Sequence, residues 1–593
     1  MSQSNKPQSD KGSDIALVRL LARFMMPYWW RMVLVLILLL TVTGLSLLPP
    51  YIIQRAVDGP ITGGNLSGLV PYGIVYFLIV LTTFGLRFGH TYLLQTVGQN
   101  ALMNMRQTLF EHILKQDIGY FNKTPVGQLV SRLSNDVDAL TDLLSTSIVM
   151  VASNLITLVG IVVVMFVLNW RLALLGLGVL PIMLIATAYF RNRIRIASAH
   201  WHKIVADYLS FLNEQFGGML IVQLFGRQAI SREEFVQVID AYLSTRLKVR
   251  DEYTLYAAVV QLLTAVGLAM ILYGGGSGVL AGWATLGMLI SFIQYTQRTF
   301  DPVLQLSDQF AQIQTALAAG DRIANMLDIQ PTITDPEHPT PLPNFAGNVT
   351  FDHVNFSYEP ETPVLRDVNI AIPAGQAVAI VGATGAGKTS LAGLLARFYD
   401  VNEGHVCLDG VDIRELSHAD LRRYVTVVPQ NPYCFNGTVA DNLRLFDPTI
   451  TTEQMLEAAK TACASRFIET LPDGYDTLLL PGGANLSQGQ RQLIALARAL
   501  IHSPHGILVL DEATSSIDAE TEALIQEGLK RVLHTRTSII IAHRLSTVRE
   551  VDRILVMQRG QVVEDGSSEQ LLARNGIYAQ LYKYQFADTP RAA

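Results

Sequence analysis

A glycine-rich stretch in the second half of the chain has residue types and spacing suited to binding nucleotide phosphates. It follows the apolar run AVAIV and precedes the helical pattern SLAGLLA. Glycines let backbone N–H groups wrap around phosphate oxygens, a lysine reaches the β and γ phosphates, and a threonine hydroxyl ligates Mg²⁺. The stretch therefore predicts a phosphate site with Thr389 on the metal, made by Gly382, Ala383, Thr384, Gly385, Ala386, Gly387, Lys388, Thr389 and Ser390.

A second motif supplies groups for hydrolysis. The stretch GILVLDEATSSID is a buried strand pattern that ends in Asp511 and Glu512. Asp511 is placed to hold Mg²⁺ through water, and Glu512 to act as general base on the attacking water. Two acids after a core strand could also be ordinary surface residues, but the upstream phosphate loop disfavours that interpretation. The loop alone would indicate only a nucleotide, since kinases, GTPases and motors share it.

The composition divides the chain into an apolar half and a soluble half. Of 593 residues, 50% are hydrophobic and only 16% charged, with a mean hydropathy of +0.30. The long apolar runs end near residue 320, and the rest has the composition of a soluble domain. A net charge of -6 and a pI near 6.1 give no support for a nucleic-acid partner. The three cysteines, Cys407, Cys434 and Cys463, have no metal or disulfide spacing, which fits a reducing cytosol.

The apolar half predicts six membrane spans. A bilayer core of about 30 Å needs roughly 20 apolar residues per helix. The N-terminus is polar and lacks the features of a secretory signal or a transit peptide. The stretch IALVRLLARFMMPYWW predicts an interfacial helix that leads into the first span. The predicted spans are residues 30–53, 70–94, 144–168, 172–189, 256–280 and 286–305.

Basic residues predict the orientation of these spans. They gather in two long connections, between spans two and three and between spans four and five, whereas the opposite connections are short and nearly uncharged. Both connections and both termini are therefore expected in the cytosol. The connections are helically patterned, so we expect the spans to extend beyond the membrane. The basic residues are Arg106, Lys115, Lys123, Arg132, Arg191, Arg193, Arg195, Lys203, Arg227, Arg232, Arg246, Lys248 and Arg250.

A few polar residues lie at or near membrane depth, among them Arg87, His90, Asn154 and Gln261. A charged group at the centre of a span costs about 3 kcal/mol or more, so Arg87 should face a cavity or a partner. Arg87 could mark a translocation pathway. The favoured interpretation is that it lies near the cytosolic interface and pairs with a carboxylate or a helix end. Neither interpretation names a substrate.

Together these motifs resemble the ATP-binding cassette (ABC) exporters, over residues 15 to 580. Further stretches match the family in the right order: NFSY, VVPQNPYCF, NLSQGQRQLIALARAL, SSID and IIIAHRLST. The resemblance implies ATP as the nucleotide and roles for individual residues. Tyr358 would stack on adenine, Gln430 would sense Mg²⁺, Asp518 would lie at the dimer interface and His543 would contact the γ-phosphate. The signature residues would be Ser487, Gln488, Gly489 and Gln490.

The resemblance also implies a fold and a domain order. The fold would be an α-helical membrane domain of six transmembrane helices, the type I ABC exporter fold, fused to an α/β P-loop nucleotide-binding domain. Two stretches, GYFNKTPVGQLVSRLSNDV and NEQFGGMLIVQLFGRQ, look like the family's coupling loops. The predicted parts are a tail and interfacial helix (1–29), the membrane domain (30–318), a Pro-rich linker (319–345), the cassette (346–580) and a C-terminal tail (581–593).

The chain holds one phosphate loop, one signature and six spans, so the resemblance implies a dimer. In this family a signature completes the ATP site of the opposite subunit. Members commonly have glycine where this chain has Gln488, and an acid where it reads LPGGAN. Glutamine adds bulk and removes glycine's freedom of backbone angle. This favours a heterodimer with one weakened site, although a homodimer that tolerates glutamine stays open.

The expected function is ATP-driven export of hydrophobic or amphipathic small molecules, of the multidrug type, across a bacterial inner membrane. A lipid flippase of the same fold is the first alternative. A regulatory or channel-like assembly is a second, and Glu512 disfavours it because a purely regulatory site needs no base. The six spans exclude a soluble cassette protein, and their fusion to the cassette disfavours an importer subunit.

Overall fold

A computed structural model describes residues 22–511, 518–542 and 545–586 of the chain. Contacts divide the chain into two compact units. The membrane unit comprises Met1–Lys115 and Pro125–Gln330, and the cassette unit comprises Gln116–Thr124 and Pro331–Ala593. Of the stretch predicted to form an interfacial helix, residues 15–30, the structure describes residues 22–30, and these are helical. The short segment Gln116–Thr124 packs with the cassette unit, although it lies between two membrane helices in the sequence.

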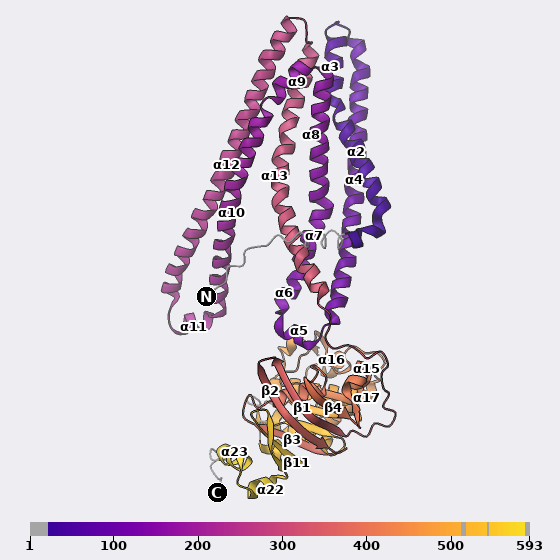
Figure 1. Cartoon of the computed structure of the whole chain (residues 1–593), viewed down its shortest axis with the longest axis vertical. Helices are drawn as coiled ribbons and strands as arrows, with labels where there is room; N and C mark the ends of the chain where they lie inside the picture. The colour runs from indigo at the N-terminus through magenta and orange to yellow at the C-terminus, as the bar shows by residue number, and fades with distance from the viewer. Residues whose placement is uncertain (1–21, 512–517, 543–544, 587–593) are drawn as a thin grey trace. The chain divides into compact units, whose positions relative to one another are not determined.

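Long helices build the membrane unit (Figure 1). Five helical stretches are long and apolar enough to cross a membrane: Ala22–Ile61, Leu66–Leu114, Val126–Leu168, Trp170–Gly217 and Gln228–Leu280. Each of the first five predicted spans lies inside one of them. Their main helices are α2 (Trp29–Ser46), α3 (Leu48–Ala56), α4 (Leu66–Leu114), α7 (Val137–Asp142), α8 (Ile148–Leu168), α9 (Trp170–Leu177), α10 (Leu180–Gly217) and α12 (Gln228–Leu280).

The sixth predicted span also forms a helix, α13 (Leu286–Asp328), but it is less apolar than the other five. Its first half contains several polar side chains, and some of these form hydrogen bonds with neighbouring helices or with the residue between them. The Tyr295 hydroxyl donates to the carbonyl of Leu47 at 2.7 Å, and Arg298 donates to that of Ser46 at 2.8 Å. The Ser291 hydroxyl donates to Gln54 at 3.1 Å. Hydropathy therefore underestimates this span, because its polar groups are paired inside the unit.

Three π-helical segments hold further polar contacts to α13. They are η2 (Val57–Ile61), η3 (Arg132–Asp136) and η4 (Leu143–Ser147). From η2, Asp58 accepts from the Thr285 hydroxyl at 2.6 Å and the Gly287 N–H at 2.8 Å. From η3, Asp136 accepts from Arg322 at 2.9 and 2.6 Å. From η4, the Ser147 hydroxyl donates to Gln312 at 3.1 Å. An extra residue in a helical turn redirects side chains, and here each π-segment directs a polar group to α13.

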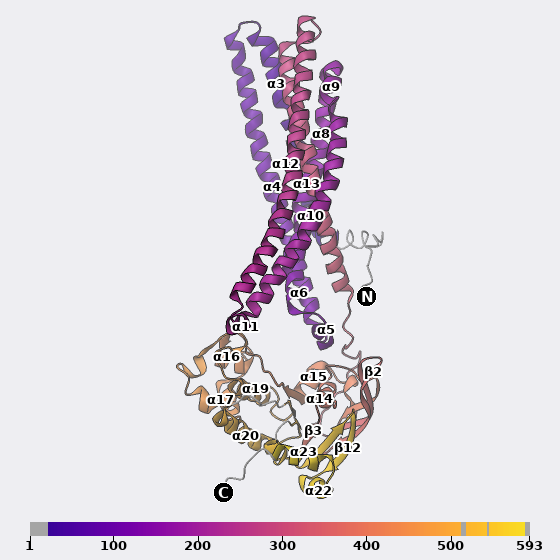
Figure 2. The ribbon, with the colours of Figure 1, turned by 90° about the vertical axis from the view of Figure 1, so that its left-hand side faces the viewer.

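The predicted helical extensions are present. Helix α4 continues to Leu114, and α10 and α12 run side by side far beyond the predicted spans (Figure 2). Short helices occupy both stretches that resemble coupling loops: α5 (Ile118–Lys123) and α6 (Val126–Ser131) in the first, and α11 (Met219–Leu224) in the second. Of these, α5 belongs to the cassette unit and the other two to the membrane unit.

The cassette unit contains a six-stranded sheet in the order β12-β11-β3-β10-β9-β6. Its strands are β3 (Ala377–Gly382), β6 (Val425–Val428), β9 (Ile507–Asp511), β10 (Ser538–Ile541), β11 (Arg553–Gln558) and β12 (Gln561–Gly566). Only the edge strand β12 pairs in antiparallel fashion; the others are parallel. Along β3, Val378 and Ile380 enter one apolar core, while Ala377, Ala379 and Val381 enter another. Such alternation is expected of a strand buried on both faces.

Each face of this sheet has its own covering. An antiparallel sheet in the order β2-β1-β4-β5 shares one core with α14 and α15. Helices α16, α17, α19 and α20 contribute to the other core and lie together in Figure 2. The bounds are β1 (Val349–Glu359), β2 (Thr362–Ile372), β4 (Glu403–Leu408), β5 (Val411–Asp412), α14 (Lys388–Leu395), α15 (His418–Tyr424), α16 (Val439–Arg444), α17 (Thr452–Thr461), α19 (Gln488–His502) and α20 (Ala519–Leu533).

Candidate ATP site

The predicted phosphate and metal residues meet at one edge of the six-stranded sheet. Strands β3, β10, β9 and β6 are neighbours and parallel, so their carboxyl ends lie on the same side. The phosphate loop follows β3, Asp511 ends β9, and Gln430 comes two residues after β6. In the register of the sheet, Ile541 of β10 pairs with both Ile380 and Asp511. Ligands of open α/β sheets bind at this edge.

Two glycines in the loop have conformations that a side chain would disturb. Gly382 has φ of +152°, and a Cβ there would lie 2.3 Å from the carbonyl oxygen of Met557. Gly387 has φ of +99°, and a Cβ there would lie 2.6 Å from a methyl group of Leu365. The loop can therefore approach its surroundings closely only with glycine at these positions.

Lys388 is held over the loop. Its ammonium donates to the carbonyls of Gly382 at 2.9 Å and Ala383 at 3.1 Å, and the side chain is buried. Burial lowers the pKa of Lys388, while the nearby charge of Asp511 opposes this shift. A lysine in this setting is poised for an anionic ligand, because a phosphate oxygen would restore the stabilisation that burial removes.

The residues predicted to hold Mg²⁺ offer only oxygen ligands. Thr389 supplies a hydroxyl, Asp511 a carboxylate and Gln430 an amide oxygen, and Thr389 and Gln430 are exposed at the surface. Oxygen donors of this kind suit Mg²⁺, which also retains waters and binds substrate phosphates. The donor set therefore fits the ion.

Tyr358 lies on β1 in a cluster of three aromatic rings. Its ring meets those of Phe356 and Tyr399 edge to face, with centroids 4.8 and 5.0 Å away. Its hydroxyl shares a hydrogen bond of 3.0 Å with Ser390, which directly follows the loop residue Thr389. The Tyr358 side chain is still 47% exposed, so a ring surface is available for a base.

The signature stretch begins helix α19. Ser487 caps this helix by accepting from the Gln490 N–H at 3.2 Å, and Gln490 accepts from the Ser487 N–H at 2.9 Å. Gln488 is the first helical residue, and its φ is not positive. The expectation that glutamine costs backbone freedom here is therefore not supported by the structure. Any effect of Gln488 therefore has to come from its side chain. This side chain stands at the N-terminal end of a helix, where the helix dipole favours anions.

Asp518 caps the next long helix, α20. Its carboxylate accepts from the Thr521 N–H at 2.9 Å, and this hydrogen bond lowers the pKa of Asp518. The two predicted catalytic residues, Glu512 and His543, lie outside the described residues. Strand β9 ends at Asp511, the residue directly before Glu512.

Comparisons with known proteins agree with this arrangement. The model of the ABC transporter transmembrane region matches residues 32–303, and the ABC transporter model matches residues 365–515. An ATP-dependent lipid A-core flippase of Syntrophus aciditrophicus is 34% identical over 584 residues, which are 98% of this chain and 97% of that protein. The chain belongs to the ABC transporter family. It joins a membrane domain and a cassette, as exporters do, and its activity is ATP hydrolysis coupled to transport.

Other relatives show how varied the family is. A Bacillus subtilis protein named as a probable multidrug resistance ABC transporter is 35% identical over 525 residues, covering 88% of this chain and 77% of that protein. The structure of a bacterial Atm1-family ABC exporter with ATP bound matches with a TM-score of 0.76 and 28% identity, over 95% of this chain and 99% of that one. ABC exporters of this kind function as dimers.

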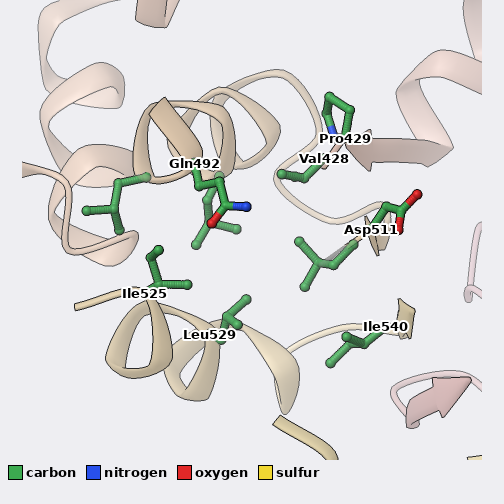
Figure 3. Close-up of a pocket in the computed structure, with 10 residues that line it drawn as sticks. Val428, Pro429, Gln492, Asp511, Ile525, Leu529 and Ile540 are labelled. Atoms are coloured by element: carbon green, nitrogen blue, oxygen red, sulfur yellow. The ribbon is translucent and has the colours of Figure 1, made fainter. Parts of the chain in front are cut away.

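A small cavity lies between the sheet and helices α19 and α20 of the cassette (Figure 3). Its volume is about 30 Å³, and apolar side chains such as Ile525, Leu529 and Ile540 line most of it. The carboxylate of Asp511 points away from it in Figure 3. A cavity of this size could hold only one or two waters, so it is not the nucleotide site. Three of the predicted ATP contacts, Thr384, Gly385 and Thr389, are exposed at the surface instead.

Two contacts around the site were missed by the sequence analysis. Tyr399 packs on Tyr358, and the amide of Asn122 on α5 donates to the Tyr399 hydroxyl at 2.6 Å. No spacing rule marks Tyr399, because its partners are far away in the sequence. Asn122 lies in a stretch that resembles a coupling loop. That resemblance did not predict its hydrogen bond to Tyr399.

Proposed function

We propose that the chain is one half of a heterodimeric exporter of hydrophobic or amphipathic small molecules in a bacterial inner membrane, with its cassette in the cytosol. The exposure of the predicted ATP contacts carries this proposal. Tyr358, Thr384, Gly385 and Thr389 lie at the surface around a buried Lys388. A second subunit's signature could cover that surface and exclude water from the phosphates.

The chemistry at this site is divided among the chain's own residues. Lys388 and the loop N–H groups hold the phosphates, and Tyr358 holds the base. Glu512 acts as general base and His543 contacts the γ-phosphate. Thr389, Gln430 and Asp511 would hold Mg²⁺, which neutralises phosphate charge when bound. Asp518 would face the partner across the dimer interface.

The signature of this chain would serve the partner's ATP site. Gly489 supplies an N–H group at the start of α19, where an anion is favoured, whereas the Ser487 N–H already donates to Gln490. The amide side chain of Gln488 stands at the same helix end and would crowd a phosphate without altering the backbone. An atypical signature combined with an intact Asp511 and Glu512 supports unequal sites, and therefore a heterodimer.

A lipid substrate is a second candidate, and Arg87 favours it. Its side chain is exposed on α4 within the predicted second span, and it forms no ion pair with any described carboxylate. A cation exposed there could hold an anionic headgroup. The relative named lipid A-core flippase points the same way. One basic residue is little for a headgroup site, so small molecules remain the first proposal.

Transport in inside-out vesicles tests the function. We expect ATP-dependent uptake of a hydrophobic fluorescent dye by the wild-type transporter. In the Glu512→Gln variant, ATP should still bind, while turnover and uptake fall about 100-fold or more through loss of the base. If every complex that contains this variant hydrolysed ATP at the normal rate, Glu512 would not be the general base.

A parallel assay with a fluorescent anionic lipid separates the two substrates. The flippase interpretation would replace the small-molecule interpretation on two results. The lipid would cross between leaflets only when ATP is present, and Arg87→Gln would slow this movement while dye uptake stays normal. Dye uptake without lipid movement supports the first proposal.

A further inference from the structure

The aromatic ring of Tyr358 is supported from behind by a second tyrosine. Tyr399 meets Tyr358 at an interplanar angle of 86° with centroids 5.0 Å apart, and its ring also approaches Phe356 at 5.8 Å. Phe356 is only 4% exposed, so this part of the cluster is fixed in the core. Edge-to-face contacts have a preferred geometry, and moving Tyr399 would therefore move the surface that Tyr358 offers to a base.

Tyr399 is held in turn by the short helix α5. The Asn122 amide donates to its hydroxyl at 2.6 Å, and a Cβ on Gly119 would lie 3.5 Å from its ring. The segment that carries Asn122 packs with the cassette unit. Burial raises the pKa of the Tyr399 hydroxyl, and the hydrogen bond from Asn122 opposes this shift.

A second contact fixes α5 itself. Asp117 caps the helix by accepting from the Tyr120 N–H at 3.2 Å. The same carboxylate accepts from Thr332 twice, from its N–H at 3.0 Å and from its hydroxyl at 2.5 Å. Helix α5 is therefore tied to the cassette at both ends, by Asp117 and by Asn122.

We propose that Tyr399 is a positioning residue for the nucleotide base, which orients Tyr358 and takes its own position from Asn122 of α5. Base binding would then depend on the placement of α5, a helix that follows the membrane helix α4 in the sequence. The proposal rests on the proposed role of Tyr358 as the platform for adenine.

Comparing ATP with inorganic tripolyphosphate tests this idea, because tripolyphosphate fills the phosphate loop but has no base. The measurements are the KM for ATP and the Ki of tripolyphosphate as a competitive inhibitor, on the purified transporter with all its subunits in lipid nanodiscs. For Tyr399→Ala we expect the KM for ATP to rise about 2- to 10-fold, the size expected from losing one aromatic contact. Its kcat and the Ki of tripolyphosphate should stay within about 2-fold.

Milder variants isolate the hydrogen bond. Tyr399→Phe keeps the ring and removes the acceptor, and Asn122→Ala removes the donor. Each should raise the KM for ATP about 2- to 3-fold, and the double variant should match the single ones because both break the same bond. Tyr424→Phe is the control, since the Tyr424 hydroxyl donates to the Leu342 carbonyl at 3.0 Å elsewhere in the cassette, and its KM should not change.

The outcomes are distinguishable. If Tyr358→Ala leaves the KM for ATP unchanged, Tyr358 is not the platform for adenine. If Tyr358→Ala raises that KM but the Tyr399 and Asn122 variants do not, only the positioning role of Tyr399 is overturned. A parallel rise in the KM for ATP and the Ki of tripolyphosphate would mean that Tyr399 merely stabilises the fold, which also contradicts the proposal.

Discussion

At the scale of single residues, backbone conformation decides which glycines matter. Gly382 and Gly387 have positive φ and close neighbours, so their replacement would distort the phosphate loop. Position 488 differs, because it begins helix α19 with an ordinary helical backbone. The sequence showed that glutamine replaces a usual glycine there, but it could not show that this position needs no special φ.

The signature can be tested with two substitutions that separate bulk from backbone freedom. Both Gln488→Ala and Gln488→Gly remove the amide side chain, and only glycine adds conformational freedom. We expect both to raise turnover at the site this signature serves by roughly 2- to 10-fold, through better access of phosphate to the helix end. The measurement is the residual ATPase rate in a Glu512→Gln background, where this chain's own site is silent.

Two results would contradict this account of Gln488. A gain with glycine but not with alanine would mean that backbone freedom matters at position 488 after all. No gain with either variant would make the glutamine neutral and remove one argument for unequal sites. Thermal melting of each variant serves as the control for altered folding.

At the scale of elements, α13 illustrates how polar pairing shapes a membrane helix. Its polar contacts run from Asp58 near one end to Asp136 near the other, and several of them come from three π-helical segments. Each of the first five spans predicted from hydropathy lies inside a helix long and apolar enough to cross a membrane, and the sixth lies in the less apolar α13. Hydropathy and periodicity could not predict the π-segments, because one extra residue in a turn leaves almost no trace in an apolar pattern. The contacts of α5 were equally hidden, since they join residues far apart in the sequence.

The ion pair between Arg322 and Asp136 should stabilise the membrane unit. Asp136 has only 10% of its side chain exposed, so Arg322→Ala leaves a nearly buried carboxylate without its partner. We expect a loss of about 1 to 3 kcal/mol, seen as a lower Tm of the purified protein. The control is Arg227→Ala, which breaks an exposed pair with Glu234 and should cost less than about 1 kcal/mol. If Arg322→Ala and Arg227→Ala lowered the Tm equally, the Arg322–Asp136 pair would contribute no more to stability than an exposed pair, which would contradict this prediction.

The attachment of α5 should weaken in acid. Partial burial would raise the pKa of Asp117, but hydrogen bonds from Thr332 and Tyr120 outweigh it and hold the pKa below its usual value. A carboxylate with a lowered folded pKa stabilises the protein above its unfolded pKa of about 3.9, and this contribution is lost as the pH falls through the folded pKa. The Tm difference between wild type and Asp117→Asn should therefore be constant from pH 5 to 7 and shrink below about pH 4.

The expected size of this difference is modest, about 1 kcal/mol, as for hydrogen bonds to a partly exposed carboxylate. Asp207→Asn is the matched control, because Asp207 is an exposed aspartate on α10. It should leave the Tm unchanged across the same range. A Tm difference for Asp117→Asn that grows as the pH falls would have the wrong sign for this account.

At the scale of the whole molecule, the chain is a half-transporter. It supplies one phosphate loop, one signature and one membrane domain, and the family functions as dimers. The family could be predicted from the sequence because its motifs are short, ordered and tied to phosphate chemistry. The transported substrate could not, since a cavity for hydrophobic compounds is lined by the same residues as any membrane span.

The composition of the native complex tests the central claim most directly. The tagged chain would be expressed in its own host, extracted gently, and the mass of the purified complex measured together with its ATPase rate. Our account predicts one copy of this chain with one copy of a second chain that has its own cassette. A complex of two copies of this chain with robust ATPase activity would contradict the heterodimer and make Gln488 a tolerated variant in two equal sites.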